Sequence, residues 1–407
     1  MSRIGIVGCG PAGLAVALLL TRQGHDVTLY EKFSRPRPLG SGLILQPTGQ
    51  AVLSELALLD TLTAVGKRID RIHGVSMPRE KTVLDVDYAA LGSDLHGIGV
   101  LRGALFEVLY SAVVAADIPI QIETDVTSVK LTPNSITPLT ANGDYLEAVD
   151  LLIDASGSSS RLRAFATKPS NRRELMYGAV WANVDWPGEP FAGNTLAQRY
   201  VAAHTMVGVL PVGRLNREHP DQAAFFWSLR VRDYPHWLGQ SIDTFQRDII
   251  NIWPDVAPIA EQLTDHASLT MAAYGHCTLP APYNSRLAFI GDAAHSTSPQ
   301  LGQGANMALL DAWALAQAID RDGIAAGLAQ YARVRRWHVR AFQLASLSMT
   351  PFYQSDSRLL AELRDLLFDP VSKLPIVKRI VAGLISGLLA SPPNDLNYRS
   401  VAKRTSA

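Results

Sequence analysis

Three glycines near the start of the chain have the spacing that a nucleotide-binding turn requires. Gly8, Gly10 and Gly13 form a G-x-G-x-x-G pattern, and Glu31 follows about 20 residues later. The first glycine permits a tight turn, the second lets backbone amides approach a pyrophosphate, and the third lets a helix pack on a strand. Glu31 can accept hydrogen bonds from the hydroxyls of an adenosine ribose. The pattern predicts a dinucleotide site and leaves open whether the dinucleotide is FAD or NAD.

The residues around these glycines predict the elements that must hold them. Residues 3–7 form an apolar run typical of a buried parallel strand, and 14–23 are rich in alanine and leucine, as in a buried helix. A second strand is expected over 26–30, which ends at Glu31. The start of the helix then faces a phosphate with unpaired N–H groups.

A second candidate site lies far along the chain. Asp292 follows the apolar strand predicted over 286–290, where its carboxylate can accept a ribityl or ribose hydroxyl. A loop that contains Pro299, Gly302 and Gly304 then precedes an apolar helix. Such a loop presents backbone amides to an electron-rich group.

These segments resemble a known family. Residues 291–295 (GDAAH), with Pro299 and the Gly-Gln-Gly at 302–304, look like the second FAD fingerprint of class A flavin monooxygenases, the para-hydroxybenzoate hydroxylase-like group. Four further segments match in family order, and the resemblance covers about the first 345 residues. These segments are 35–47, 101–106 with Arg102, Asp125-Val126, and 150–163.

The resemblance implies FAD as cofactor and NADPH or NADH as a transient reductant. It implies hydroxylation of an aromatic or polycyclic small molecule with O2, through a flavin C4a-hydroperoxide. The implied catalytic loop residues, beside the reactive edge of the flavin, are Pro299, Gly302 and Gly304. The implied cofactor-binding residues are Gly8, Gly10, Pro11, Ala12, Gly13, Glu31, Lys32, Gly42, Arg102, Val126, Gly157, Asp292, Gly304, Ala305 and Asn306.

The chain departs from the family at Ser156, where the family has an aspartate linked with pyrophosphate binding and nicotinamide handling. Altered use of the nicotinamide is therefore expected. Asp154 lies two positions earlier, about 6–7 Å away along a strand, and is expected to compensate in part.

The order of these motifs predicts an α/β fold. A Rossmann-like FAD-binding domain is expected from 1–70, 97–168 and 277–345, with an inserted antiparallel substrate sheet from 71–96 and 169–276. A helical segment is expected over 346–407, with helices broken at its prolines, Pro351, Pro370 and Pro375. One strand is expected over 199–211. The aromatic residues of the long insert are expected to form an apolar roof over the flavin. They are Tyr177, Trp181, Tyr200, Phe225, Phe226 and Trp227.

Composition excludes several classes of protein. The 37 Lys and Arg residues balance 37 Asp and Glu residues, which argues against a nucleic-acid partner. Two cysteines cannot build a disulfide framework, and no metal site is expected. No signal peptide or membrane-spanning run is read, so a cytoplasmic monomer or dimer is expected. Residues 376–390 carry apolar side chains at helical spacing; a packed helix is favoured over a peripheral membrane contact.

Two alternatives remain. One is a flavin-dependent reductase or dehydrogenase on the same scaffold, and the other is a flavin-free carrier of the same fold. The intact set of Gly8, Gly10, Gly13, Glu31 and Asp292 argues against the carrier.

Overall fold

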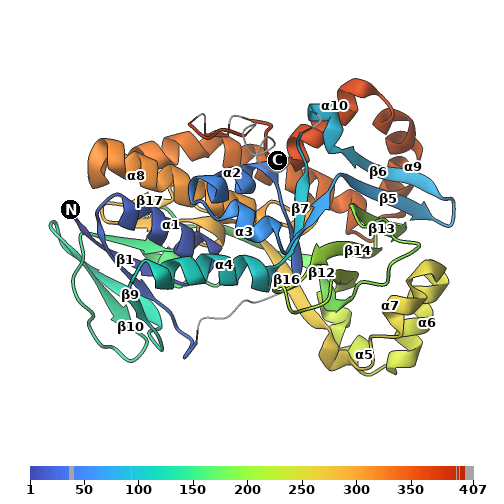
Figure 1. Cartoon of the computed structure of the whole chain (residues 1–407), viewed down its shortest axis with the longest axis horizontal. Coiled ribbons are helices and arrows are strands. Elements are labelled where there is room, and N and C mark those ends of the chain that lie inside the picture. Colours follow the sequence, from blue (N-terminus) through green and yellow to red (C-terminus); the bar gives the residue numbers. More distant parts are fainter. Residues whose placement is uncertain (36–40, 93, 391, 394, 399–407) are drawn as a thin grey trace.

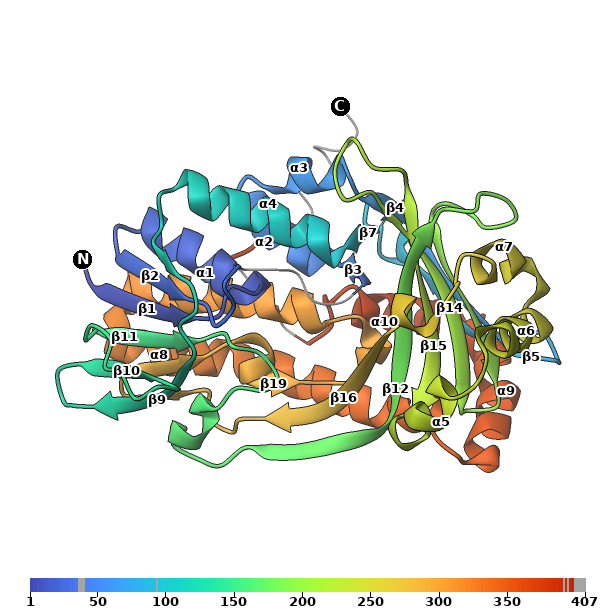
Figure 2. The same ribbon diagram turned by 90° about the horizontal axis from the view of Figure 1, so that it is seen from below.

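The computed structural model describes residues 1–35, 41–92, 94–390, 392–393 and 395–398. The first part of the segment 35–47, residues 36–40, therefore lies outside the described residues. Two large sheets stand side by side (Figures 1 and 2). The segment α8 (Gly304–Tyr353), which consists of two helices joined by a kink at Gly323, packs against both layers.

The first sheet is the expected nucleotide-binding sheet. Its strand order is β17-β18-β11-β1-β2-β8, and all pairs are parallel except β17 with β18. The strands are β1 (Arg3–Val7), β2 (Asp26–Tyr30), β8 (Ile120–Gln121), β11 (Leu151–Asp154), β17 (Tyr283–Asn284) and β18 (Leu287–Phe289). Both faces are buried, which explains why its strands read as unbroken apolar runs.

Helices cover one face of this sheet and a hairpin covers the other. The helices are α1 (Pro11–Arg22), α4 (Arg102–Ala115) and α8 (Gly304–Tyr353), and the hairpin is β9 (Val126–Leu131) with β10 (Ile136–Thr140). A three-stranded sheet, β3-β7-β4, joins this layer to the second sheet. Its strands and the neighbouring helices are β3 (Gly42–Leu45), β4 (Lys67–Ile69), β7 (Gly97–Leu101), α2 (Pro47–Glu55) and α3 (Leu59–Thr63).

The second sheet has eight strands in the order β19-β16-β12-β15-β14-β13-β5-β6. Its strands are β5 (Arg71–Met77), β6 (Lys81–Asp87), β12 (Asn171–Asp185), β13 (Thr195–Val201), β14 (Thr205–Gly213), β15 (Gln222–Arg230), β16 (Thr270–Thr278) and β19 (His295–Ser296). It is antiparallel as expected, except that β13 and β5 pair in parallel. This pair joins the short insert to the long one.

The aromatic residues of this sheet do not form one roof, which corrects the expectation from the sequence. Trp181 and Phe226 face the nucleotide-binding layer, whereas Phe225 and Trp227 face the opposite side. Successive residues of a strand point to opposite faces, so neighbouring aromatic residues must separate. The far face is covered by α5 (Tyr234–Leu238), α6 (Ile242–Ile252) and α7 (Ala257–Ala260), as Figure 2 shows.

Two further expectations were wrong in detail. Residues 199–211 are not one strand, because a turn at 202–204 divides them between β13 and β14. Pro351 and Pro370 do not break helices where they stand, but lie in the last turn of α8 and of α9 (Arg358–Ser372). The φ angle of proline is helical, so a chain can finish the turn after it. Pro375 starts α10 (Pro375–Ile385), as a first-turn proline does.

The end of α10 packs onto the nucleotide-binding layer. The carbonyl of Ile385 accepts a hydrogen bond from the Gln303 side chain, and the carbonyl of Gly387 lies 3.0 Å from Nε2 of His338. Ile376 and Ile380 on the outer side of the helix are exposed. Within the described part of the chain, no helix combines the length and apolar character needed to cross a membrane.

Candidate FAD site and active site

The glycine turn between β1 and α1 has the geometry that its spacing predicts. Gly8 has a φ of +100°, a region that side chains disfavour. A Cβ on Gly13 would lie 2.0 Å from the carbonyl oxygen of Gly8, so only glycine permits this contact between helix and turn. A Cβ on Gly10 would meet no protein atom within 4 Å. The protein leaves space beside Gly10, at the position where the pattern predicts a pyrophosphate.

Glu31 is fixed at the end of β2 by two backbone amides. Its carboxylate accepts hydrogen bonds from the amides of Cys9 at 2.9 Å and Phe33 at 3.1 Å, and the side chain is buried. The acid is thus held against the glycine turn, where the sequence predicts an adenosine ribose. Lys32 next to it is exposed and lies over the ring of Phe33.

The second motif physically connects the two sheets. Asp292 follows β18 of the first sheet, and His295 and Ser296 then pair with β16 of the second. Any ligand held by Asp292 therefore lies where the two layers meet.

Asp292 combines accessibility with a protein-rich environment. Its side chain is exposed, yet the surrounding protein raises the pKa of its carboxyl group, against the lowering effects of His295, Arg102 and Arg163. The carboxylate of Asp292 is thus accessible to a ligand. The electrostatic influence of Arg102 on both Asp292 and Tyr274 places this arginine near the second motif and the second sheet.

The loop at 299–304 ends in the N-terminus of α8. Gly302 has a φ of +59°, and a Cβ on Gly304 would meet no protein atom within 4 Å. The first amides of a helix lack intrahelical partners and carry partial positive charge, so Gly304 and Ala305 offer donors to an electron-rich group.

The side chain of Asn306 is bonded to the protein itself. Its amide oxygen accepts from the backbone N–H of Gln46 at 2.8 Å, and its nitrogen donates to the carbonyls of Ile44 and Gly302. The side chain is therefore occupied in fixing the loop to β3, and only its backbone amide is left for a ligand.

Gln46 is a candidate that the sequence did not single out. It is fully buried, Tyr88 donates to its Oε1, and its Nε2 has no protein partner. That nitrogen lies 3.9 Å from the position of a Cβ on Gly302. Three more buried polar atoms without a protein partner belong to Ser298, Gln300 and Gln303. Buried polar atoms normally have partners, so this concentration at one loop points to a bound ligand.

In the third motif, Ser156 lies against the carboxylate of Asp154. Asp154 is fully buried, and its Oδ1 accepts from the amide of Ser156 at 3.0 Å and from its hydroxyl at 2.6 Å. Ser160 donates to the other oxygen. Both oxygens of Asp154 thus accept bonds from within the protein, and compensation by Asp154 for the missing aspartate stays a prediction.

Arg163 links the third motif to the second and was not singled out in advance. It donates to the carbonyls of Gly157 and Ser158 and to those of Asp292 and Ala293. Arg163 is the last residue of the third motif, and this position in the motif is the sequence feature that could have identified it.

The remaining candidate cofactor-binding residues differ in their surroundings. Gly157 has a φ of +84° and open space beside it, and Val126 begins β9 in the buried cluster around Tyr30. Gly42 has a packing role, since a Cβ there would lie 2.4 Å from the Val212 side chain of the second sheet. Contacts of Gly42 and Val126 with a cofactor stay predictions.

The residues present fit FAD. Open space at Gly10 and Gly304 lies at the two turns predicted to meet the pyrophosphate and the flavin. The fixed acid Glu31, the accessible Asp292 and the unpartnered amide of Gln46 add polar groups suited to the ribose, the ribityl chain and the flavin. In the described residues, no cluster of three or more His, Cys, Asp or Glu side chains has the geometry of a metal site.

Comparison with known proteins supports this interpretation. Residues 1–345 match the family described as FAD binding domain. The chain belongs to this family. It is a class A flavin monooxygenase, an enzyme family that uses FAD together with NADH or NADPH.

Several relatives span most of the chain. It is 25% identical to the 3-amino-4-hydroxybenzoate 2-monooxygenase of Streptomyces cremeus, over 78% of either chain. It is 28% identical to the kynurenine 3-monooxygenase of Salinispora arenicola, over 86% of this chain and 79% of that one. The structure of Klebsiella pneumoniae HpxO with FAD and uric acid has a TM-score of 0.79 at 21% identity, and covers 96% of this chain and 97% of its own. This last likeness establishes the fold.

Proposed function

We propose that this monooxygenase hydroxylates an aromatic or polycyclic small molecule that binds between the 299–304 loop and the second sheet. Bound FAD, once reduced by NADH or NADPH, supplies the activated oxygen from O2 that such a reaction needs. The protein must orient the substrate, exclude water and stabilise charge.

The observation that carries the proposal is the aromatic surface on the inner face of the second sheet. Trp181 lies against Phe226 with ring centroids 4.7 Å apart, and its indole N–H donates to the hydroxyl of Tyr274 at 2.8 Å. An apolar wall with a few fixed polar groups is typical of a small-molecule site. The relatives named for 3-amino-4-hydroxybenzoate and kynurenine also support an aromatic substrate.

Tyr274 adds a polar group to this wall. Burial raises the pKa of its hydroxyl to about 12, against the lowering effects of Trp181 and Arg102. The hydroxyl therefore stays protonated near neutral pH. It accepts from Trp181 and keeps its own proton, which we propose it donates to a polar substituent of the substrate.

The start of α8 has an electrostatic role in this proposal. The amides of Gly304 and Ala305 provide fixed positive charge where negative charge develops during the reaction. Pro299 and Gly302 shape the loop that brings these amides to the reacting edge.

The test is oxidation of NADH and NADPH by the purified holoenzyme against a panel of aromatic compounds. A substrate should accelerate NAD(P)H oxidation, consume O2, and yield a product that contains one additional oxygen atom. Rapid NAD(P)H oxidation with an electron acceptor, without O2 uptake or oxygen in the product, would instead establish a reductase.

A further inference from the structure

A second recess lies on the outer face of the second sheet, away from the candidate FAD site. Its volume is about 250 Å³. It is bordered by β5, β13, the loop at 190–192 and the chain after α6. The lining residues Arg71, His73, Ala197 and Arg199 alternate with residues that face the nucleotide-binding layer, so the sheet separates this recess from the FAD site.

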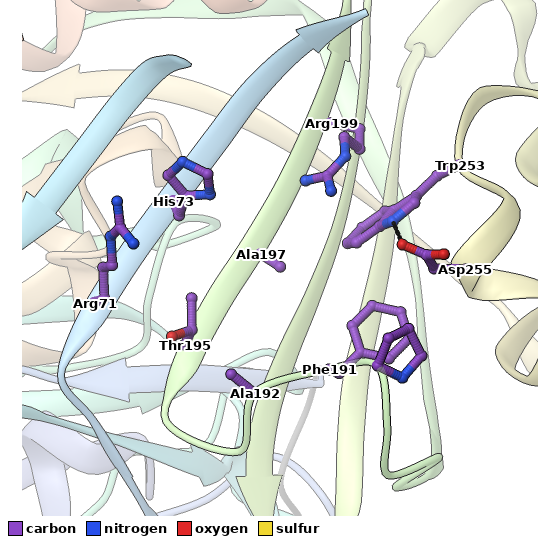
Figure 3. Close-up of a pocket in the computed structure, with 10 residues that line it drawn as sticks. Arg71, His73, Phe191, Ala192, Thr195, Ala197, Arg199, Trp253 and Asp255 are labelled. Atoms are coloured by element: carbon purple, nitrogen blue, oxygen red, sulfur yellow. Dashed lines mark hydrogen bonds between the residues drawn. The ribbon is translucent and has the colours of Figure 1, made fainter. Parts of the chain in front are cut away.

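Figure 3 shows where the cationic and apolar side chains of the recess lie. Arg71 and His73 project from β5, and Arg199 projects from β13 toward the same space. Ala197 lies at the centre of the floor, and Ala192 and Phe191 border the opposite end. A ligand that fills this space meets Arg199 and the Trp253 ring at one end, and Phe191 and Ala192 at the other.

Arg199 is a charged residue of the recess without a close carboxylate partner among the described residues. Its guanidinium lies over the ring of Trp253, 4.4 Å from the centroid, and it donates to the carbonyl of Gln198. Among the described residues, no carboxylate lies within 4.0 Å of it, although Asp255 and Glu80 act on it from farther away. Burial lowers the pKa of Arg199, against the raising effects of Asp255 and Glu80.

The other charged groups that line the recess, Arg71 and Asp255, already have protein partners. Arg71 donates to Asp85 at 2.7 Å through Nε, which leaves its terminal nitrogens free of this bond. Asp255 is held by the indole N–H of Trp253 at 3.2 Å. Burial lowers the pKa of His73, aided by Arg71 and Arg199, so the imidazole is neutral at pH 7 and adds a hydrogen-bonding group without charge.

We propose that this recess binds a small organic carboxylate, with the carboxylate on Arg199 and the apolar body over Ala197 toward Phe191. A guanidinium matches a carboxylate with two parallel hydrogen bonds. The apolar end favours an organic acid over a bare inorganic anion, and the small volume excludes large ligands. This site is independent of the proposed hydroxylation.

The test uses benzoate, its neutral analogue benzamide, and inorganic phosphate as probes of the FAD-loaded enzyme, with calorimetry to measure binding. The flavin absorbance spectrum is recorded in parallel, because benzoate at the FAD site would perturb it and benzoate in the recess would not. We expect saturable benzoate binding without a spectral change. Benzamide and phosphate should bind at least tenfold more weakly.

Three variants locate the site. Arg199→Gln removes the charge and should weaken this benzoate binding about tenfold. Ala197→Leu keeps every charge but places a larger side chain on the floor of the recess. This variant should also bind benzoate more weakly than the parent. Arg232→Gln removes an exposed arginine that pairs with Asp233, and should bind benzoate like the parent. FAD content and melting temperature verify the folding of each variant.

Equal benzoate affinity in the parent, Arg199→Gln and Ala197→Leu would overturn the proposal. The proposal would also be overturned if the parent enzyme showed no benzoate binding, or only binding that perturbs the flavin spectrum. Phosphate or benzamide binding as tight as that of benzoate would overturn the assignment to an organic carboxylate.

Discussion

Nε2 of His295 lies 2.6 Å from a carboxylate oxygen of Asp311, and both side chains are buried. The same oxygen accepts from the amide of Gly291, and the other oxygen accepts from Nε of Arg335 at 2.7 Å. Although burial opposes ionisation, His295 and Arg335 lower the pKa of Asp311 to about 2. The carboxylate of Asp311, in the first half of α8, thus connects the second motif to Arg335 in the second half of α8. His295 is a positioning residue in this arrangement.

The network continues to the end of the chain. Nη1 of Arg335 donates to Nδ1 of His338, whose Nε2 donates to the carbonyl of Gly387. The segment that follows α10 is therefore coupled to the loop that carries Asp292.

The two glycines of the first turn should respond differently to the same change. Gly10→Ala places a methyl group in space that the protein leaves open, so the chain should fold but lose FAD. Gly13→Ala forces a contact of 2.0 Å with the Gly8 carbonyl and should lower the melting temperature itself. Flavin absorbance and thermal unfolding measure the two effects. Full FAD content in Gly10→Ala would show that the pyrophosphate lies elsewhere.

Asp292→Ala should weaken FAD binding by about 1.5–3 kcal/mol, the value of one lost charge-assisted hydrogen bond. Titration of the apoprotein with FAD measures the loss. Asp322→Ala is the matched control, because this aspartate pairs with Arg321 on the surface. An unchanged FAD affinity in Asp292→Ala would remove the ribityl assignment.

The position of the acid in the third motif should govern nicotinamide use. Ser156→Asp alone places a second carboxylate against buried Asp154 and should destabilise the fold, because like charges repel. The double change Asp154→Ser with Ser156→Asp keeps one carboxylate and moves it to the position where the family has it. We expect a changed rate of flavin reduction or a changed preference between NADH and NADPH, measured by stopped flow. Identical kinetics would leave Ser156 without a role in reduction.

His338 should make the protein sensitive to acid. Burial, with the charge of Arg335, lowers its pKa from 6.5 to about 3 in the folded state. Between these values the unfolded chain binds a proton that the folded chain does not, so stability falls as the pH drops from 6.5 toward 3. From pH 7 to pH 5 this loss is about 2 kcal/mol. His338→Gln should reduce the difference between urea unfolding at the two pH values. An equal difference in parent and variant would contradict the assignment.

Removal of residues from Pro370 onward should cause aggregation or loss of FAD, because the bonds to Gln303 and His338 are lost. Gly387→Ala tests the packing of the segment after α10 by adding a single methyl group. Gly387 has a φ of +82°, and a Cβ there would lie 2.5 Å from Oγ1 of Thr48. Ile376→Ser on the exposed side of α10 is the control and should retain FAD. A truncated chain that stays folded and active, but no longer pellets with liposomes, would favour a membrane contact instead.

The sequence by itself determined the nucleotide-binding half. The glycine turn, the acid after β2 and the GDAAH loop are local patterns whose spacing follows from backbone geometry, so they can be identified without contacts across the chain. The alternation of side chains along each strand could also be recognised in the sequence. The face of the sheet on which each side chain lies could not, because it depends on what packs against each side of the sheet. Phe225 and Phe226 are neighbours in sequence that lie on opposite sides of the protein's second sheet.

Only the tertiary structure decided the long-range partners. The bond that Ser156 donates to Asp154 was close enough in sequence to be foreseen. The bond from Arg335 to Asp311 depends instead on how α8 folds back at Gly323, and the bond from His338 to Gly387 depends on how α10 packs against α8. The recess at Arg199 exists because β13 lies beside β5, more than a hundred residues away in sequence. Hydrophobic periodicity shows that a strand will pair, but the order of strands in a sheet is set by the packing of the whole domain.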